Sequence, residues 1–136
     1  MKEEQIYSLA LTHIPGLGLI GAHRLIEAVG SATTIFKEAK HLDDWLPDIS
    51  PALKEELNNH NVLRICEKEL QFAEKNHISC LTLQDEQYPS RLRNCDDAPV
   101  ALFYRGSTDL NRLHIINMVG TRRATEYGKG ICVRFL

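Results

Sequence analysis

Residues 78–83 read Ile-Ser-Cys-Leu-Thr-Leu, and at this stretch the spacing of apolar residues along the chain changes. Before it, apolar residues recur every three or four positions, which is typical of helices. The stretch itself is short, apolar and partly β-branched, which predicts a strand. We therefore expect a helical part in residues 1–77 and a part built on strands in residues 78–136, in an α+β or α/β arrangement.

Short helices with recognisable ends are predicted in the first part. Gly30 is suited to close one helix, and Ser31 to cap the next. Ser50 followed by Pro51 is a start signal, because proline is favoured at the first helical position. The last and longest of these helices is expected over 62–75, with Asn76 in the left-handed conformation that ends it. A further turn is expected over 42–46.

The second part contains two more apolar runs. Residues 101–104 predict a short strand that ends before Gly106. Residues 115–119 are almost continuously apolar, which is typical of a buried parallel strand. They lead into a polar turn and a helix expected from Glu126 onward, so the end of the chain is interpreted as a strand–turn–helix unit.

Composition places the chain among ordinary globular proteins. It has 136 residues, 16 Lys and Arg against 18 Asp and Glu, and 43% hydrophobic residues. No apolar run approaches the roughly 18 residues that a membrane helix needs, and the acidic start is unlike a signal peptide. We expect a cytoplasmic protein with no membrane contact.

Charge is unevenly distributed. Residues 1–80 carry 8 cations against 12 acids, a balance of −4, whereas residues 81–136 carry 8 against 6, a balance of +2. Seven of the eight cations in the second part are arginine, whose planar guanidinium suits phosphate. The net charge of −2 does not by itself favour the binding of nucleic acid.

Cysteine and histidine spacing predicts no metal site. The four cysteines are far apart and form no Cys-x-x-Cys pair, whereas zinc sites use closely spaced ligands. We interpret them as buried small hydrophobes in a reducing compartment. The sequence also shows no nucleophile elbow, phosphate-binding loop or His-Glu-x-x-His motif, so we expect neither a catalytic residue nor a cofactor.

The turn after the third apolar run is the first candidate site. It contains Gly120, Thr121, Arg122 and Arg123 just before a helix start. Paired guanidinium groups beside the positive end of a helix dipole favour an anion such as a phosphate chain. Alternatively, these arginines pair with nearby acids on an ordinary surface turn.

The second candidate is the hairpin Pro15-Gly16-Leu17-Gly18. It resembles a helix-hairpin-helix motif, in which glycines allow a sharp turn and close approach of another molecule. Amides at the start of the following helix can then donate to phosphate without reading bases. The alternative is a purely structural link between two packed helices. The nearby basic support is limited to His23 and Arg24.

Taken together, these motifs resemble the DNA-processing protein A (DprA/Smf) family. The resemblance rests on Val119-Gly120-Thr121-Arg122 with Thr125, Tyr127 and Gly128, preceded in the family's order by the Pro15–Gly18 hairpin, Gly30-Ser31, Tyr88-Pro89, Asp97-Ala98-Pro99 and Gly106.

The resemblance implies a fold and a function. It implies an all-helical helix-hairpin-helix or SAM-like domain in 1–77, followed by the truncated start of a Rossmann-like domain in 78–136, since family members are about twice as long. It also implies a non-enzymatic protein that binds and protects single-stranded DNA and loads the RecA recombinase in natural transformation, as a homodimer when intact. Arg122 then belongs to the DNA pocket, with Arg123 beside it.

Two other functions remain open from the residues. One is a helical protein-interaction module without DNA contact. The other is a Rossmann-like enzyme that binds a nucleotide phosphate at the same turn, although the only carboxylate near that turn is Glu126.

Overall fold

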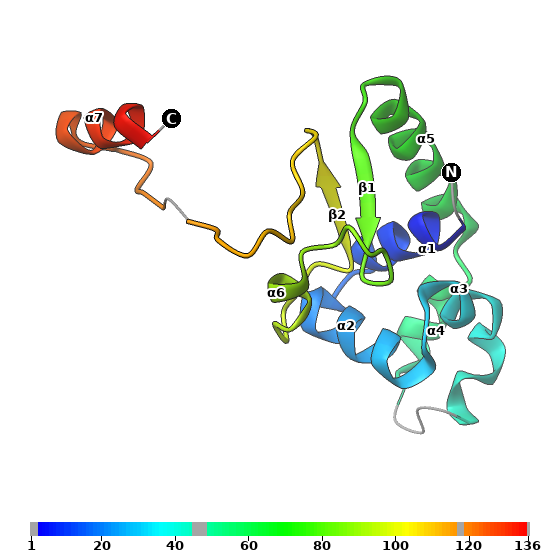
Figure 1. Cartoon of the computed structure of the whole chain (residues 1–136). Helices are drawn as coiled ribbons and strands as arrows, with labels where there is room; N and C mark the ends of the chain where they lie inside the picture. Colours follow the sequence, from blue (N-terminus) through cyan, green and yellow to red (C-terminus); the bar gives the residue numbers. More distant parts are fainter. Residues whose placement is uncertain (1–2, 45–48, 117–118, 136) are drawn as a thin grey trace.

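The structure, a computed structural model, describes residues 3–44, 49–116 and 119–135. Its elements in chain order are α1 (Glu3–Thr12), α2 (Gly18–Val29), α3 (Ala32–Lys37), the 3-10 helix η1 (Ala39–Asp44), α4 (Pro51–Leu57), α5 (His60–Lys75), β1 (Ser79–Thr82), α6 (Ser90–Arg93), β2 (Ala101–Tyr104) and α7 (Glu126–Phe135). The chain is a mixed α+β protein: a mostly helical region, then a small two-stranded sheet and a last helix (Figure 1).

The predicted helix caps are confirmed. Ser31 Oγ accepts from the Thr34 amide at 3.0 Å, and Ser50 Oγ accepts from the Leu53 amide at 3.2 Å. Gly30, with φ of 102°, closes α2 by donating its amide to the carbonyl of Ile26. Each cap satisfies a backbone group that the helix itself leaves without a partner.

The end of α5 differs from the prediction. Asn76 has φ of −101°, and the left-handed residue is His77, with φ of 55°. The Ile78 amide donates to the Ala73 carbonyl, and the His77 amide to the Glu74 carbonyl. This is the Schellman arrangement, which puts the left-handed residue one position after the cap. The helix also begins at His60 rather than 62, because Asn59 caps it by accepting from the Asn61 amide. Of the turn expected over 42–46, residues 45 and 46 lie outside the described residues.

Helices and strands share the core. One cluster of buried side chains spans α1, α2, α3, η1 and α4 and includes Val100, next to β2; a second joins α1 and α5 to Cys80 of β1. Tyr88, in the loop between the strands, is fully buried and donates its hydroxyl to the Pro99 carbonyl at 2.7 Å. The division of the chain at residue 77 into two domains stays a prediction.

The two predicted strands at 78–83 and 101–104 are confirmed, and they pair with each other. β1 and β2 are antiparallel, with Ser79 opposite Tyr104 and Thr82 opposite Ala101. On its other edge β1 is covered by α1, because Gln5 Nε2 donates to the Cys80 carbonyl at 2.7 Å.

The strand predicted over 115–119 is wrong at the residues that the structure describes. Ile115, Ile116 and Val119 have no regular structure and are 45%, 84% and 92% exposed; residues 117 and 118 lie outside the described residues. An apolar run forms a strand only beside another strand that satisfies its backbone groups. Here the chain leads away from the sheet after Leu113, whose carbonyl accepts from Arg91 at 2.8 Å (Figure 1).

Candidate nucleic-acid interface

The turn that precedes α7 presents all four of its candidate residues to solvent. Gly120, Thr121, Arg122 and Arg123 are exposed, and Thr121 Oγ1 donates to the Arg123 carbonyl at 3.0 Å. Thr125 Oγ1 then caps α7 by accepting from the Gly128 amide at 3.2 Å. The turn therefore places two adjacent arginines immediately before a helix N-terminus.

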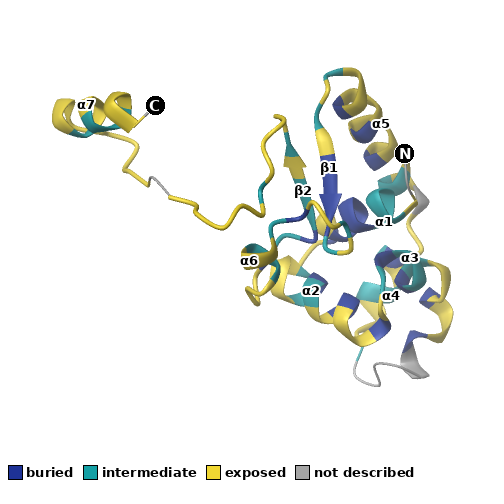
Figure 2. Cartoon of the chain, in the orientation of Figure 1, coloured by how far each residue is buried: buried dark blue, intermediate teal, exposed yellow. Residues whose placement is uncertain are grey.

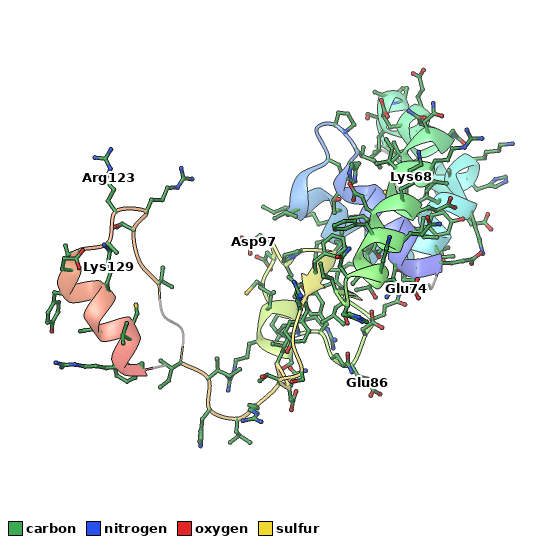
Figure 3. All side chains as sticks on the ribbon, turned by 90° about the horizontal axis from the view of Figure 1, so that it is seen from above. Lys68, Glu74, Glu86, Asp97, Arg123 and Lys129 are labelled. Atoms are coloured by element: carbon green, nitrogen blue, oxygen red, sulfur yellow. The ribbon has the colours of Figure 1, made fainter. Side chains whose placement is uncertain are left out.

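Neither arginine is neutralised by a described carboxylate. Among the side chains that the structure describes, no ion pair reaches Arg122 or Arg123. Glu126, the acid nearest in sequence, instead accepts from Lys129 at 2.7 Å. Figure 3 shows Arg123 projecting from the turn into open space. Two cations without counter-charges beside the positive end of a helix dipole form an arrangement that attracts anions.

The hairpin has the predicted backbone. Gly16 and Gly18 have φ of 78° and 64°, a region that side chains with a Cβ rarely adopt, so the turn depends on glycine. Pro15, Gly16 and Gly18 are exposed, and α2 starts at Gly18 without a side-chain cap.

The electrostatic surroundings of the hairpin are acidic. Together with the start of α4 it encloses a groove of about 400 Å³, whose lining includes the carboxylates of Glu55 and Glu56. Of the two basic side chains noted in the sequence, His23 lies 3.5 Å from Glu27. The hairpin thus has the geometry but not the charge of a phosphate site.

The structure does not bring the two candidate sites together. Figure 1 shows α7 and its turn apart from α1 and α2, which flank the hairpin.

Comparison with known proteins gives one match. Residues 79–136 match the family described as DNA recombination-mediator protein A. The similarity to that family covers the C-terminal part of the chain. That part contains the arginine turn, β1, β2 and α7, and the match confirms the resemblance seen in the sequence. No curated protein and no solved structure matches the chain.

Within the matched segment, two arginines make structural contacts that the sequence analysis did not predict. Arg93 donates to the Asp85 carbonyl at 2.6 Å, and its guanidinium carbon lies 5.6 Å from the centre of the Tyr88 ring. Arg91 holds the Leu113 carbonyl. Arg93 thus holds the loop around Tyr88, and Arg91 holds the segment that follows β2, so neither is part of the arginine turn. Arg91 and Arg93 follow the buried Tyr88 by three and five residues. This spacing is only a weak indication of a structural role, because arginines on a basic surface could have the same spacing.

Among the residues that the structure describes, no group of three or more histidine, cysteine, aspartate or glutamate side chains could hold a metal ion. Burial raises the pKa of the thiols of Cys66 and Cys80 to about 11. Both are therefore protonated near neutral pH, and a protonated thiol is a weak nucleophile. His13, the residue that follows α1, has its Nδ1 atom 3.9 Å from Cys66 Sγ of α5. None of the described helices is long and apolar enough to cross a membrane.

Proposed function

We propose that the chain takes part in recombination mediation by binding single-stranded DNA at the turn formed by Gly120, Thr121, Arg122 and Arg123. One observation carries the proposal: two exposed guanidinium groups without a described carboxylate partner precede α7, inside the segment that matches the mediator family. Mediation is a binding role, so the proposal includes neither an enzymatic activity nor a cofactor.

The turn is suited to the phosphate backbone rather than to bases. A guanidinium can donate two parallel hydrogen bonds to one phosphate, and helix N-terminal amides can receive another phosphate oxygen. Contacts of this kind position a strand without reading its sequence. The site would accordingly bind any single strand and discriminate little between sequences.

The hairpin residues Pro15, Gly16 and Gly18 are a secondary DNA contact in this proposal. Their exposed backbone supports it, whereas Glu55 and Glu56 beside them weigh against it, because carboxylates repel phosphate. Any contribution of the hairpin to DNA affinity should therefore be smaller than that of the arginine turn.

The remaining parts of the proposal rest on the family resemblance. They are a helix-hairpin-helix or SAM-like N-terminal domain, the opening of a Rossmann-like domain, a homodimeric whole protein, loading of RecA onto DNA in transformation, and a cytoplasmic location. Loading can be tested by asking whether the chain speeds RecA filament growth on a single strand that is coated with single-strand-binding protein.

Fluorescence anisotropy with a labelled oligothymidylate tests the DNA site. If two arginines neutralise two phosphates, the logarithm of the binding constant should fall with the logarithm of salt concentration with a slope of about −1.4. Arg122→Ala should weaken binding and bring the slope to about −0.7.

The matched control is Arg105→Ala, which removes the same charge from another exposed position. Equal losses in the two variants would show a general charge effect and refute the turn as the site.

A further inference from the structure

A groove between α5 and β2 has two aromatic rings in its lining. Its volume is about 520 Å³, and it is lined by Lys68, Glu69, Phe72, Ala73, Ile78 and Phe103. Phe72 of α5 is 65% exposed, and Phe103 of β2 is 45% exposed. Exposed apolar side chains that gather in a groove are typical of a binding site. Neither phenylalanine has a part in the arginine turn or in the hairpin.

The charges on α5 are distributed unequally around Phe72. A helix turns by about 100° per residue, so three cations lie within about 80° of Phe72 on one side: Arg64, Lys68 and Lys75. By the same spacing, Glu67 and Glu74 lie about 140° and about 160° from Phe72. All five charged residues are on the exposed surface of α5 (Figure 2). A basic stripe therefore runs along α5 beside the aromatic groove.

The two charged residues of the groove itself differ in their partners. The carboxylate of Glu69 lies 3.7 Å from Nε2 of His13. Among the side chains that the structure describes, no ion pair reaches Lys68, which lies on α5 (Figure 3). The groove thus combines two aromatic rings with an ammonium group that is available to a ligand.

This combination suits single-stranded nucleic acid better than a protein partner. Proteins that bind single strands without sequence preference place aromatic side chains, on which bases stack, beside cations that attract the phosphate backbone. Lysine, by contrast, is depleted in protein–protein interfaces. A duplex has no free base faces to offer, because its bases stack on one another.

We infer that bases of single-stranded DNA stack on Phe72 and Phe103 in this groove, while the backbone of the strand passes Lys68. The inference rests on the proposed function for its ligand, but it concerns a second contact, which is made to bases rather than to phosphates. Every base has an aromatic face, so stacking tolerates any sequence. Phe72 also lies before the segment that matches the mediator family, so the contact would extend the DNA site beyond that segment.

Fluorescence anisotropy with two labelled strands of equal length tests the stacking. One strand is oligothymidylate, and the other is an abasic strand that has the same phosphates but no bases. In the full chain, Phe72→Leu together with Phe103→Leu keeps apolar side chains and removes the rings. This double variant should bind oligothymidylate about tenfold more weakly and the abasic strand within about twofold of the unaltered chain. The loss should be equal at low and high salt, because stacking releases no counterions.

The matched control is Phe135→Leu. It makes the same change at a phenylalanine of α7 that is 70% exposed and does not line the groove. It should leave the affinity for oligothymidylate unchanged. Arg122→Ala, in contrast, should weaken the binding of both strands, because both have the phosphates that the arginine turn is proposed to hold.

These variants separate the stacking from the arginine turn. If Arg122→Ala weakens the binding of oligothymidylate and the double leucine variant does not, the stacking inference is overturned and the proposed function stands. An equal loss for both strands in the double leucine variant would also contradict stacking, since the abasic strand has no base to lose. If the unaltered chain binds neither strand, the inference and the proposed function fall together.

Photochemical cross-linking needs no variant. An oligothymidylate that contains 5-iodouracil is irradiated in complex with the unaltered full chain, and mass spectrometry locates the cross-linked peptides. We expect cross-links in peptides that contain Phe72 or Phe103. Cross-links confined to residues 119–135 would place the bases at the arginine turn and overturn the groove as the stacking site.

Discussion

At the residue scale, Glu4 of α1 contacts the N-terminus of α3. Its carboxylate accepts from the Ala32 amide at 2.8 Å, from the Thr33 amide at 3.0 Å and from Thr33 Oγ1 at 2.6 Å. An acid at a helix N-terminus is favoured by the dipole and satisfies amides that the helix leaves free. Glu4→Ala should therefore lower the free energy of unfolding by about 1–3 kcal/mol.

Urea denaturation followed by circular dichroism measures this change. Glu67→Ala removes an exposed acid from α5 and should change the free energy of unfolding by less than about 0.5 kcal/mol. If Glu4→Ala and Glu67→Ala lower the free energy of unfolding equally, the hydrogen bonds of Glu4 to α3 contribute nothing to stability.

The buried thiols predict how stability depends on pH. Burial raises the pKa of Cys66 and Cys80 from 9.0 to about 11, so the unfolded chain loses these protons at lower pH than the folded one. The stabilisation is complete below about pH 9 and is lost as the pH rises toward 11. Cys80→Ala should flatten the fall of unfolding free energy across this window.

Thiol labelling provides the kinetic counterpart. At neutral pH exposed Cys95 and half-exposed Cys132 should react quickly with Ellman's reagent, while Cys66 and Cys80 react only on unfolding. Four thiols of equal reactivity in the native chain would be incompatible with the buried positions.

At the scale of elements, the Pro15–Gly18 hairpin needs glycine because of its backbone conformation, and not because a Cβ atom would clash with a neighbour. Gly18 has φ of 64°, and a Cβ built on it would meet nothing within 4 Å. Gly18→Ala should thus cost about 1–2 kcal/mol through backbone strain alone. Gly120 also has open space around a Cβ but no left-handed φ, so Gly120→Ala should change thermal stability little. Equal melting temperatures for the two variants would show that the hairpin relaxes without cost.

Local signals explain which elements were predictable. Ser31, Ser50 and Thr125 cap the helices that follow them because a cap needs only neighbours two or three residues away. The antiparallel pairing of β1 with β2 joins residues that lie 19 to 25 positions apart, and no local pattern determines it. The run at 115–119 has the composition of a strand, yet strand formation requires a partner strand that the described sheet does not offer.

In the candidate sites too, the local features were predictable and the long-range ones were not. The order of glycine, arginines and Thr125 located the turn before α7, since a capped helix start is a local feature. The acidic surroundings of the hairpin were not predictable, because Glu55 and Glu56 lie about forty residues further along the chain. Their approach follows from the packing of α4 beside the hairpin.

At the scale of the whole molecule, charge and burial divide the chain at the same place. Residues 1–104 carry 10 cations and 16 acids, a balance of −6, and residues 105–136 carry 6 and 2, a balance of +4. Among the described residues, the last buried one is Val100. The acidic part therefore contains the described core, and the described residues of the basic part are mostly exposed.

This division predicts the course of limited trypsin digestion. Arg112, Arg122 and Arg123 are exposed and lie outside helices and strands, whereas cations such as Arg24 and Lys68 lie in packed helices. Proteases attack exposed irregular segments first, so in dilute solution mass spectrometry should find early cleavage after these three arginines. The product that ends at Arg112 retains every described buried residue and should keep a cooperative unfolding transition within a few degrees of the intact chain. Early cuts within α2 or α5 instead would mean that the helical region, not the basic end, is the less stable part.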